Sequence, residues 1–323
     1  MSEKFIDLFA GIGGFRIALE KEGSKCVYTS EWDKFAQITY DHNFNDLPEG
    51  DITQINPKSI PDHDILCGGF PCQAFSISGK QGGFDDTRGT LFFDVANIVK
   101  HKKPRVLFLE NVRNFIRHDG GRTLNTIKNV LDKLGYDVYT SVLNSSNFGV
   151  PQHRQRVYII CFNKDLNVTN FEFPPPSYEE IYLRDILEKN VDTKDYEINR
   201  TDMVIKGNEK LLANDLVPGK RLKPIRVGTI NKGGQGERIY SPEGHAITLS
   251  AYGGGVAGKT GAYLIDGKVR QLTKRECLRV QGFPETFNFP KEISKGQVYK
   301  MCGNSVSVPV ISKIYQKIKY AIS

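Results

Sequence analysis

Near its N-terminus the chain reads Asp7-Leu8-Phe9-Ala10-Gly11-Ile12-Gly13-Gly14-Phe15. The apolar run Phe5–Phe9 predicts a buried strand, and the spacing of apolar residues in Phe15–Glu22 predicts a helix. Glycines between a strand and a helix allow a tight turn and let the backbone approach another group closely. This segment therefore indicates a strand–turn–helix unit of the kind found in α/β proteins.

Further along the chain the same alternation recurs. Lys34–Asn43 has a helical pattern, and short apolar runs predict four more strands at Cys26–Ser30, Asp64–Cys67, Arg105–Leu109 and Val157–Cys161. Strands separated by helices favour a mostly parallel sheet that is covered on both faces, a Rossmann-like α/β fold. Ligands of such sheets bind beyond the carboxyl ends of the strands, so the residues at those ends are the candidates for function.

The second half has a different character. Pro174-Pro175-Pro176 is a stiff break, and residues 228–267 contain 11 glycines interleaved with polar and aromatic residues. Short strands with tight turns fit this composition, so we expect a smaller, β-rich domain over residues 184–272. Helices are expected again at Thr273–Val280 and Val306–Ala321.

Composition excludes several classes of protein. The chain has 323 residues, of which 39% are apolar and 25% are charged, so global disorder is excluded. No apolar run reaches the roughly 18 residues of a membrane helix, and no signal-peptide stretch follows Met1, so we expect neither membrane insertion nor secretion.

The net charge of +7 is unevenly distributed along the chain. Residues 1–100 carry 9 basic and 15 acidic side chains, whereas residues 201–323 carry 20 and 9. Such asymmetry suggests a polyanionic partner for the C-terminal part, although a merely solvated surface would also produce it.

Six cysteines are present, and only one has a distinctive context. No pair has C-x-x-C or zinc-site spacing, so most are expected to be buried, reduced thiols. Cys72 instead follows Gly68-Gly69-Phe70-Pro71, after the third expected strand, where a nucleophile would be placed. Glu110 follows the fourth strand, and Arg154 and Arg156 precede the fifth at alternate positions. A thiol, a carboxyl and two cations at one sheet edge predict nucleophilic and general acid chemistry, with the cations favouring the thiolate.

The glycine-rich turn predicts a nucleotide-type ligand without defining it. Glu31 ends the second strand 20 residues after Gly11, where an acid commonly binds ribose hydroxyls, and Trp32 and Asp51-Ile52 could enclose an adenine. A nicotinamide cofactor, an S-adenosyl cofactor and a turn without a ligand all fit these residues.

Taken in order, five blocks of sequence closely resemble the motif set of the DNA (cytosine-5)-methyltransferase family. The blocks are Asp7–Phe15, Gly69–Gln73, Glu110–Val112, Gln152–Arg156 and Gly303–Val306. Residues 233–240 and 246–255 also resemble the recognition domain of the bacterial HhaI-type modification methyltransferases, which are specific for GCGC.

The resemblance implies an S-adenosylmethionine-dependent enzyme that flips a cytosine out of duplex DNA. It implies that Cys72 adds to carbon 6, that Glu110 contacts or protonates nitrogen 3, and that carbon 5 takes the methyl group before the proton and Cys72 are released. It further implies that Arg154 and Arg156 hold the flipped nucleotide. The products would be 5-methylcytosine and S-adenosylhomocysteine, and no metal is required.

The resemblance also assigns binding residues and domain limits. The implied cofactor residues are Phe9, Gly11, Gly13, Glu31, Trp32, Asp51, Ile52, Pro71, Leu91 and Asn304. The implied DNA-binding residues are Ser78, Gln235, Arg238, Thr248, Tyr252 and Gly255. Arg238 would read guanine in the major groove, and Gln235 and Ser78 would fill the space of the flipped base. The expected domains are residues 1–183 with the helix 303–323 for catalysis, 184–272 for target recognition, and 273–302 as a return segment.

The expected setting follows from these assignments. We expect a monomer that acts on double-stranded DNA in the bacterial cytoplasm, without a membrane or metal partner. Its methylation would protect DNA from a cognate restriction endonuclease, which need not bind it. The alternatives are an RNA cytosine-5 methyltransferase of the same fold, a dinucleotide-dependent dehydrogenase, and a DNA-binding protein without activity.

Overall fold

The computed structural model describes residues 2–71, 91–177, 179, 181–206 and 222–323. The chain divides into two compact units. The first comprises Met1–Leu143, Gln155–Pro174 and Ile311–Ser323, and the second comprises Asn144–Arg154 and Pro175–Val310.

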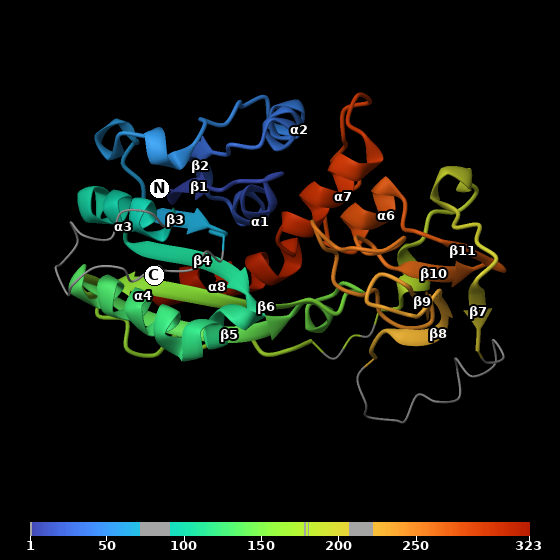
Figure 1. Ribbon diagram of the computed structural model, residues 1–323. Helices are drawn as coiled ribbons and strands as arrows, with labels where there is room; N and C mark the ends of the chain where they lie inside the picture. Colours follow the sequence, from blue (N-terminus) through green and yellow to red (C-terminus); the bar gives the residue numbers. More distant parts are fainter. Residues whose placement is uncertain (1, 72–90, 178, 180, 207–221) are drawn as a thin grey trace. The chain divides into compact units, whose positions relative to one another are not determined.

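A six-stranded sheet forms the centre of the first unit, in the order β2-β1-β3-β4-β6-β5 (Figure 1). The strands are β1 (Lys4–Leu8), β2 (Lys25–Ser30), β3 (Ile65–Gly68), β4 (Val106–Val112), β5 (Tyr136–Asn144) and β6 (Gln155–Asn163). Strands β2, β1, β3 and β4 run parallel, and β6 is antiparallel to β4. The predicted α/β fold with a mostly parallel sheet is confirmed.

Helices accompany this sheet. They are α1 (Gly14–Lys21), α2 (Lys34–Phe44), α3 (Leu91–Lys102), α4 (Arg122–Lys133) and α8 (Val308–Ile322), with short 3-10 helices that include η1 (Ile52–Gln54). Because side chains alternate along a strand, the two faces of the sheet bury different sets. On one face Leu66 and Leu107 pack in one core with Val95 of α3 and Ile127 of α4. On the other face Phe108 meets Phe15 of α1, with ring centroids 5.1 Å apart. Burial on both faces explains the continuous apolar runs of these strands.

In the second unit the main feature is a five-stranded sheet with the order β11-β10-β9-β8-β7. Its strands are β7 (Met203–Ile205), β8 (Ile225–Ile230), β9 (Arg238–Ser241), β10 (Ala262–Ile265) and β11 (Lys268–Arg270), followed by the helices α6 (Lys274–Arg279) and α7 (Lys295–Asn304). Its small core includes Val227, Ile239 and Ala262. The expected β-rich region is therefore present as a separate sheet.

The limits of the compact units differ from the expected domain limits. Residues 175–183 and 273–302 group with the second unit, as does the short segment Asn144–Arg154. These units follow packing, so the functional division of the chain stays a prediction. In the part of the chain that the structure describes, none of the helices combines the length and the apolar character needed to cross a membrane.

Candidate active site

The glycine-rich turn after β1 has the backbone conformation that glycine favours. Gly11 and Gly13 have φ angles of 56° and 83°. A Cβ atom on Gly13 would lie 2.3 Å from Cε2 of Phe44, so a side chain there would clash as well as strain the backbone. Phe9, directly before the turn, also has a positive φ of 55°, which is uncommon for a bulky residue and typical of functional sites.

Beside this turn, Glu31 is held at the end of β2. One carboxylate oxygen accepts a hydrogen bond from the Gly11 amide and the other from the Asp33 amide, both at 2.8 Å. Burial raises the pKa of Glu31, and these amide donors oppose that shift. The turn and Glu31 are therefore joined by a direct hydrogen bond, and the two amide donors fix the carboxylate in place.

The other expected cofactor residues of the first unit surround the same strand ends. Trp32 follows Glu31 and is 77% exposed, which is unusual for a tryptophan. Asp51 caps η1 by accepting a hydrogen bond from the Thr53 amide at 2.9 Å, and Ile52 is buried. A glycine turn, a fixed carboxylate and an exposed indole form a set that fits an adenosine group, whose ring would cover the indole.

Three further residues of this group lie at element ends. Pro71 is exposed after β3, Leu91 is the half-buried first residue of α3, and Asn304 is the exposed last residue of α7. Asn304 belongs to the second unit, and the other two belong to the first.

Glu110 and Arg156 form an ion pair at the end of β4. Arg156 Nε lies 3.0 Å from Glu110 Oε1, and both side chains are largely buried. The register of β4 and β6 explains the contact, since Glu110 pairs with Tyr158 and Val112 with Arg156 in the antiparallel ladder. The pair presents a carboxyl and a guanidinium side by side at the carboxyl edge of the parallel strands.

The loop after β3 is tied to this pair. Asn111 donates a hydrogen bond from its buried side-chain amide to the Phe70 carbonyl at 2.9 Å. A Cβ atom on Gly69 would lie 3.4 Å from Glu110 Oε2, so glycine leaves the carboxyl room. The residue types therefore bring the loop that leads to Cys72 next to Glu110. Cys72 and Ser78 lie outside the described residues.

The five cysteines within the described ranges are poor nucleophiles. Four of them are buried, Cys26 is half-buried, and burial raises the pKa of every one of these thiols. Their environments agree with the expectation of reduced packing residues and leave Cys72 as the candidate nucleophile.

Arg154 has a different environment from the one we expected. Its side chain is 2% exposed, and its guanidinium donates to the carbonyls of Leu249, Gly303 and Ser305 at 3.1, 3.2 and 2.5 Å. All four residues belong to the second unit. In this structure the guanidinium is engaged with three interior carbonyls, and the expected role of Arg154 in holding the nucleotide stays a prediction.

In the second unit, two glycine-rich loops lie in direct backbone contact. The Ala257 amide donates to the Gly236 carbonyl at 3.0 Å. A Cβ atom on Gly236 would lie 1.8 Å from the Gly254 carbonyl oxygen of the other loop. Within that second loop, a Cβ atom on Gly253 would lie 1.7 Å from the Gly258 carbonyl oxygen. Only glycine permits this approach. The two loops line a groove of about 530 Å³.

The expected DNA-binding residues fall into two groups. Gln235, Tyr252 and Gly255 line the groove between the loops, and Tyr252 is 80% exposed. Arg238 is exposed at the start of β9 and does not line the groove. Thr248 is half-buried, and its hydroxyl donates to the His153 carbonyl at 2.6 Å, so this side chain is engaged internally.

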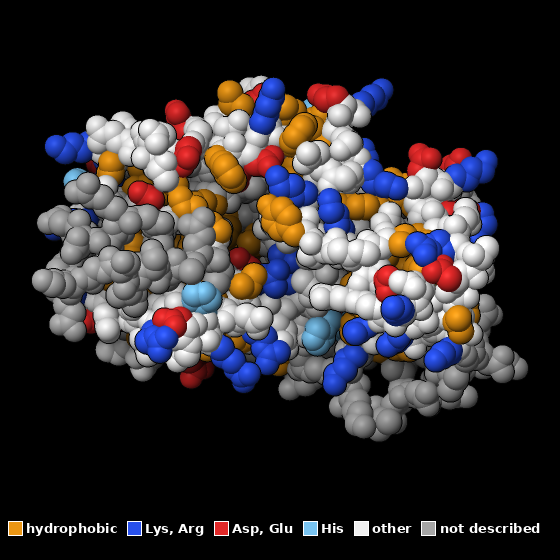
Figure 2. Space-filling model, in the orientation of Figure 1, with side chains coloured by type: hydrophobic (Ala, Val, Ile, Leu, Met, Phe, Trp, Pro, Cys, Tyr) orange, Lys and Arg blue, Asp and Glu red, His pale blue; other side chains and the backbone are white. Residues whose placement is uncertain are grey.

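Positively charged side chains lie over the strands β8 and β9, next to the groove. Figure 2 shows Lys and Arg side chains over β8 and β9 of the second unit. The exposed basic residues of this region include Lys223, Arg226, Lys232 and Arg238. A basic surface next to a groove is the electrostatic pattern of a nucleic-acid interface.

Two residues with clear structural functions were missing from the predicted site. Asn111 holds the Phe70 carbonyl, and the buried Gln152 donates to the Val280 carbonyl at 2.9 Å. Both residues lie inside the motif blocks, next to the charged residues that the sequence predicts for the site. Their amide side chains can form hydrogen bonds with buried backbone groups, and this property could have indicated their structural functions.

Comparison with known proteins covers nearly the whole chain. The family model described as C-5 cytosine-specific DNA methylase matches residues 3–320. The chain is 53% identical to the type II methyltransferase M.HhaI of Haemophilus parahaemolyticus over 98% of this chain and 94% of the relative. It is 46% identical to M.HpaII of Haemophilus parainfluenzae over 97% and 88%.

Among solved structures, the Dnmt2 methyltransferase of S. pombe has a similar fold. The TM-score is 0.72 at 22% identity, and 97% of each chain is covered.

Proposed function

Because the chain belongs to the C-5 cytosine-specific DNA methylase family and is a DNA cytosine-5 methyltransferase, we propose that it methylates the inner cytosine of GCGC. The base would be flipped out of the duplex and attacked by Cys72. The ion pair of Glu110 and Arg156 is the observation that carries this proposal.

The pair complements one edge of cytosine. Nitrogen 3 needs a partner that can share or donate a proton, and the neighbouring oxygen 2 accepts hydrogen bonds. A carboxyl and a guanidinium 3.0 Å apart can serve these adjacent atoms. Proton sharing at nitrogen 3 draws electrons from carbon 6, where the Cys72 thiolate would add. Carbon 5 then becomes nucleophilic and would take the methyl group. Loss of the proton from carbon 5 with elimination of the Cys72 thiolate would then release 5-methylcytosine and regenerate the enzyme.

S-adenosylmethionine fits the site at the ends of β1 and β2 and supplies an activated methyl group when bound. Glu31 would bind ribose hydroxyls, and Trp32 would lie against the adenine, as the fixed carboxylate and the exposed indole suggest. Phe9, Gly11, Gly13, Asp51, Ile52, Pro71, Leu91 and Asn304 would complete the site.

Target recognition is assigned to the two glycine-rich loops. Arg238 would donate two hydrogen bonds to guanine, while Gln235 and Ser78 would occupy the space of the flipped base. Tyr252, Gly255 and Thr248 would position the loops on DNA, and nearby lysines would contact phosphates. The GCGC target itself rests on the resemblance of residues 233–240 and 246–255 to HhaI-type enzymes.

The relatives are type II methyltransferases, which supports a place in a restriction–modification system. We therefore propose that the enzyme acts as a monomer on duplex DNA in the bacterial cytoplasm and protects it from a cognate endonuclease.

A mechanism-based trap tests the proposal. Fluorine at carbon 5 cannot leave as the proton does, so a GCGC duplex with 5-fluorocytosine and S-adenosylmethionine should give a stable covalent complex. Cys72→Ser should abolish the complex, and Glu110→Gln should slow its formation by roughly 10²-fold or more. A wild-type enzyme that forms no complex, or a Cys72→Ser variant that still does, would overturn the mechanism. Trapping on RNA alone would favour the RNA alternative.

A further inference from the structure

We propose that Gln152 and Arg154 are positioning residues, which hold the recognition segment Ala246–Gly255 against the end of α7 and so set target discrimination. This inference rests on the proposed function, because it assigns DNA recognition to that segment. All residues that carry it belong to the second unit.

The segment that contains Gln152 and Arg154 pairs with the start of the recognition segment. The Ala246 amide donates to the Pro151 carbonyl at 2.7 Å, and the His153 amide donates to the Ala246 carbonyl at 2.9 Å. The Thr248 hydroxyl then donates to the His153 carbonyl. These contacts align the two segments up to residue 248.

At Leu249 the backbone of the recognition segment is bound by the side chains of Gln152 and Arg154 and not by backbone groups. Its carbonyl accepts from Arg154 Nη1 at 3.1 Å, and its amide donates to Gln152 Oε1 at 3.4 Å. Both polar groups of one buried peptide residue are therefore satisfied by side chains two positions apart. Buried backbone groups need such partners, so removing either side chain would leave a group at Leu249 without its partner.

The other end of Arg154 holds the end of α7. The last carbonyls of a helix lack intrahelical donors and attract cations. Arg154 Nη2 donates to the carbonyls of Gly303 and Ser305, which flank Asn304. Gly303 also packs on the recognition segment, since a Cβ atom there would lie 2.3 Å from the Ala251 amide nitrogen. One guanidinium thus joins the recognition segment to the helix end that carries a proposed cofactor residue.

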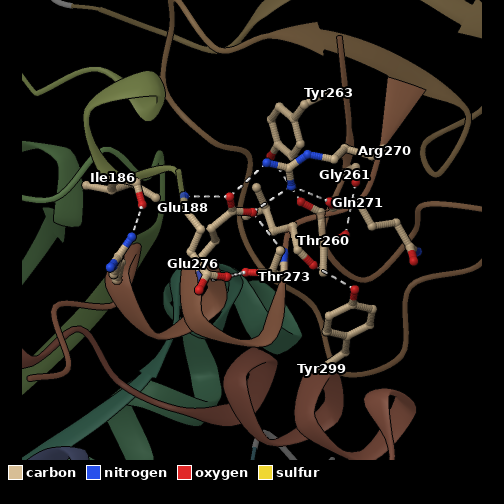
Figure 3. Close-up of polar contacts among 12 residues, drawn as sticks. Ile186, Glu188, Thr260, Gly261, Tyr263, Arg270, Gln271, Thr273, Glu276 and Tyr299 are labelled. Carbon is tan, nitrogen blue, oxygen red and sulfur yellow. Dashed lines mark hydrogen bonds and ion pairs between the residues drawn. The ribbon is translucent and has the colours of Figure 1, made fainter. Parts of the chain in front are cut away.

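Figure 3 shows a second buried arginine of this unit, which provides a matched control. Arg270 of β11 is 3% exposed, and both of its terminal nitrogens donate to the Glu276 carboxylate at 2.7 and 2.8 Å. The same carboxylate accepts from the Thr273 and Glu188 amides, so this cluster stabilises the unit's interior. Lysine at position 154 or 270 keeps the charge but loses the planar fork that bonds several acceptors.

The test compares Arg154→Lys with Arg270→Lys in the full-length enzyme. For Arg154→Lys, the ratio of kcat/KM between a GCGC duplex and one with a single changed outer base pair should fall by about tenfold or more. Hydrogen exchange without DNA should show lost protection at the amides of Leu249, Ser250 and Ser305, with β1 and β4 unchanged. Arg270→Lys should lower the melting temperature while keeping discrimination within about twofold of wild type.

Two results would overturn the inference. The first is an Arg154→Lys variant whose kcat/KM ratio and amide protection equal those of the wild-type enzyme. The other is an equal loss of discrimination in Arg270→Lys, which would show general loosening of the unit. Failure of the proposed function would look different, because the wild-type enzyme itself would not methylate GCGC. The exchange measurement would then still decide whether Arg154 holds residues 249–250 and 305. Should Arg154→Lys not fold, Gln152→Met removes the acceptor of the Leu249 amide and serves the same comparison.

Discussion

Arg154 and Arg156 lie two residues apart in the chain, yet their guanidinium groups have different acceptors. Arg156 is paired with the Glu110 carboxylate, whereas Arg154 is surrounded by backbone carbonyls. Alternation along an extended segment puts both side chains on the same side in principle, so sequence alone gave them one role. Their partners come from residues about 50 positions before and about 100 to 150 positions after them, and local sequence contains no information about those partners.

The arrangement of the glycine-rich turn and Glu31 was more predictable at this scale. A glycine turn and an acid at the end of the next strand imply each other through the geometry of adjacent parallel strands. The structure shows the two side by side, joined by the hydrogen bond from the Gly11 amide to Glu31. The positive φ of Phe9 and the wide exposure of Trp32 could not be predicted, because neither follows from residue type.

One buried acid gives a test by pH. Asp7 in β1 is fully buried, and burial raises its pKa well above the ordinary value, against a smaller opposing effect of Arg16. An acid whose pKa is raised in the folded state holds its proton more tightly there than in the unfolded chain. Folding is therefore favoured below the unfolded pKa, and this contribution is lost as pH rises towards the folded pKa.

Asp7→Asn removes this titration while nearly keeping the shape. We expect the variant to be more stable than wild type near pH 8, by about 1 kcal/mol or more, since one pKa unit corresponds to about 1.4 kcal/mol. The difference should shrink as the pH falls towards 4. Urea unfolding of both proteins across this range measures it, and a difference that is constant with pH would contradict the argument.

At the scale of elements, the strands buried on both faces were predicted to within a few residues. Each of them contains a continuous apolar run because both of its faces are covered. Strand β5 lies at the edge of the sheet, and most of its residues are only half-buried, so Tyr136–Asn144 has no such run and was not predicted. The antiparallel direction of β6 was also not predicted from the sequence, because strand direction depends on the connection between strands and not on the strand's own composition.

The two glycine-rich loops to which we assign recognition are packed together, and glycine is required where they meet. Gly236→Ala would place a methyl group 1.8 Å from the Gly254 carbonyl oxygen, which forces the loops apart. We expect GCGC affinity to fall by about tenfold or more, with cofactor affinity unchanged, in a filter-binding or fluorescence assay.

Gly254→Ala is the matched control for this change. A Cβ atom at Gly254 meets nothing within 4 Å, and the backbone there does not require glycine. This variant should bind GCGC within about twofold of wild type. Equal losses in both variants would show that the loops respond to any added methyl group and that their close contact has no special function.

Charge acts at the scale of the whole molecule. The first 100 residues contain the glycine-rich turn after β1 and are net acidic, while residues 201–323 contain the two glycine-rich loops and carry 20 basic and 9 acidic side chains. The exposed basic residues over β8 and β9 agree with that division (Figure 2). A charge asymmetry counted from the sequence carries over to the surface, because charged side chains remain at the surface whatever the fold.

In the proposed function this basic surface binds DNA, and it would then release counterions from the phosphates that it neutralises. Affinity for a nonspecific duplex should therefore fall steeply with salt, by about 10³-fold between roughly 50 and 200 mM if six phosphates are contacted.

A pair of substitutions locates the contact. Lys232→Gln, on the exposed part of the second unit, should make the slope of log affinity against log salt concentration shallower by about 1 if Lys232 contacts a phosphate. Lys58→Gln removes an exposed charge from the first unit and should leave the slope unchanged. The DNA contact would lie outside residues 201–323 if the affinity of the wild-type enzyme did not change with salt, or if the two substitutions changed the slope equally.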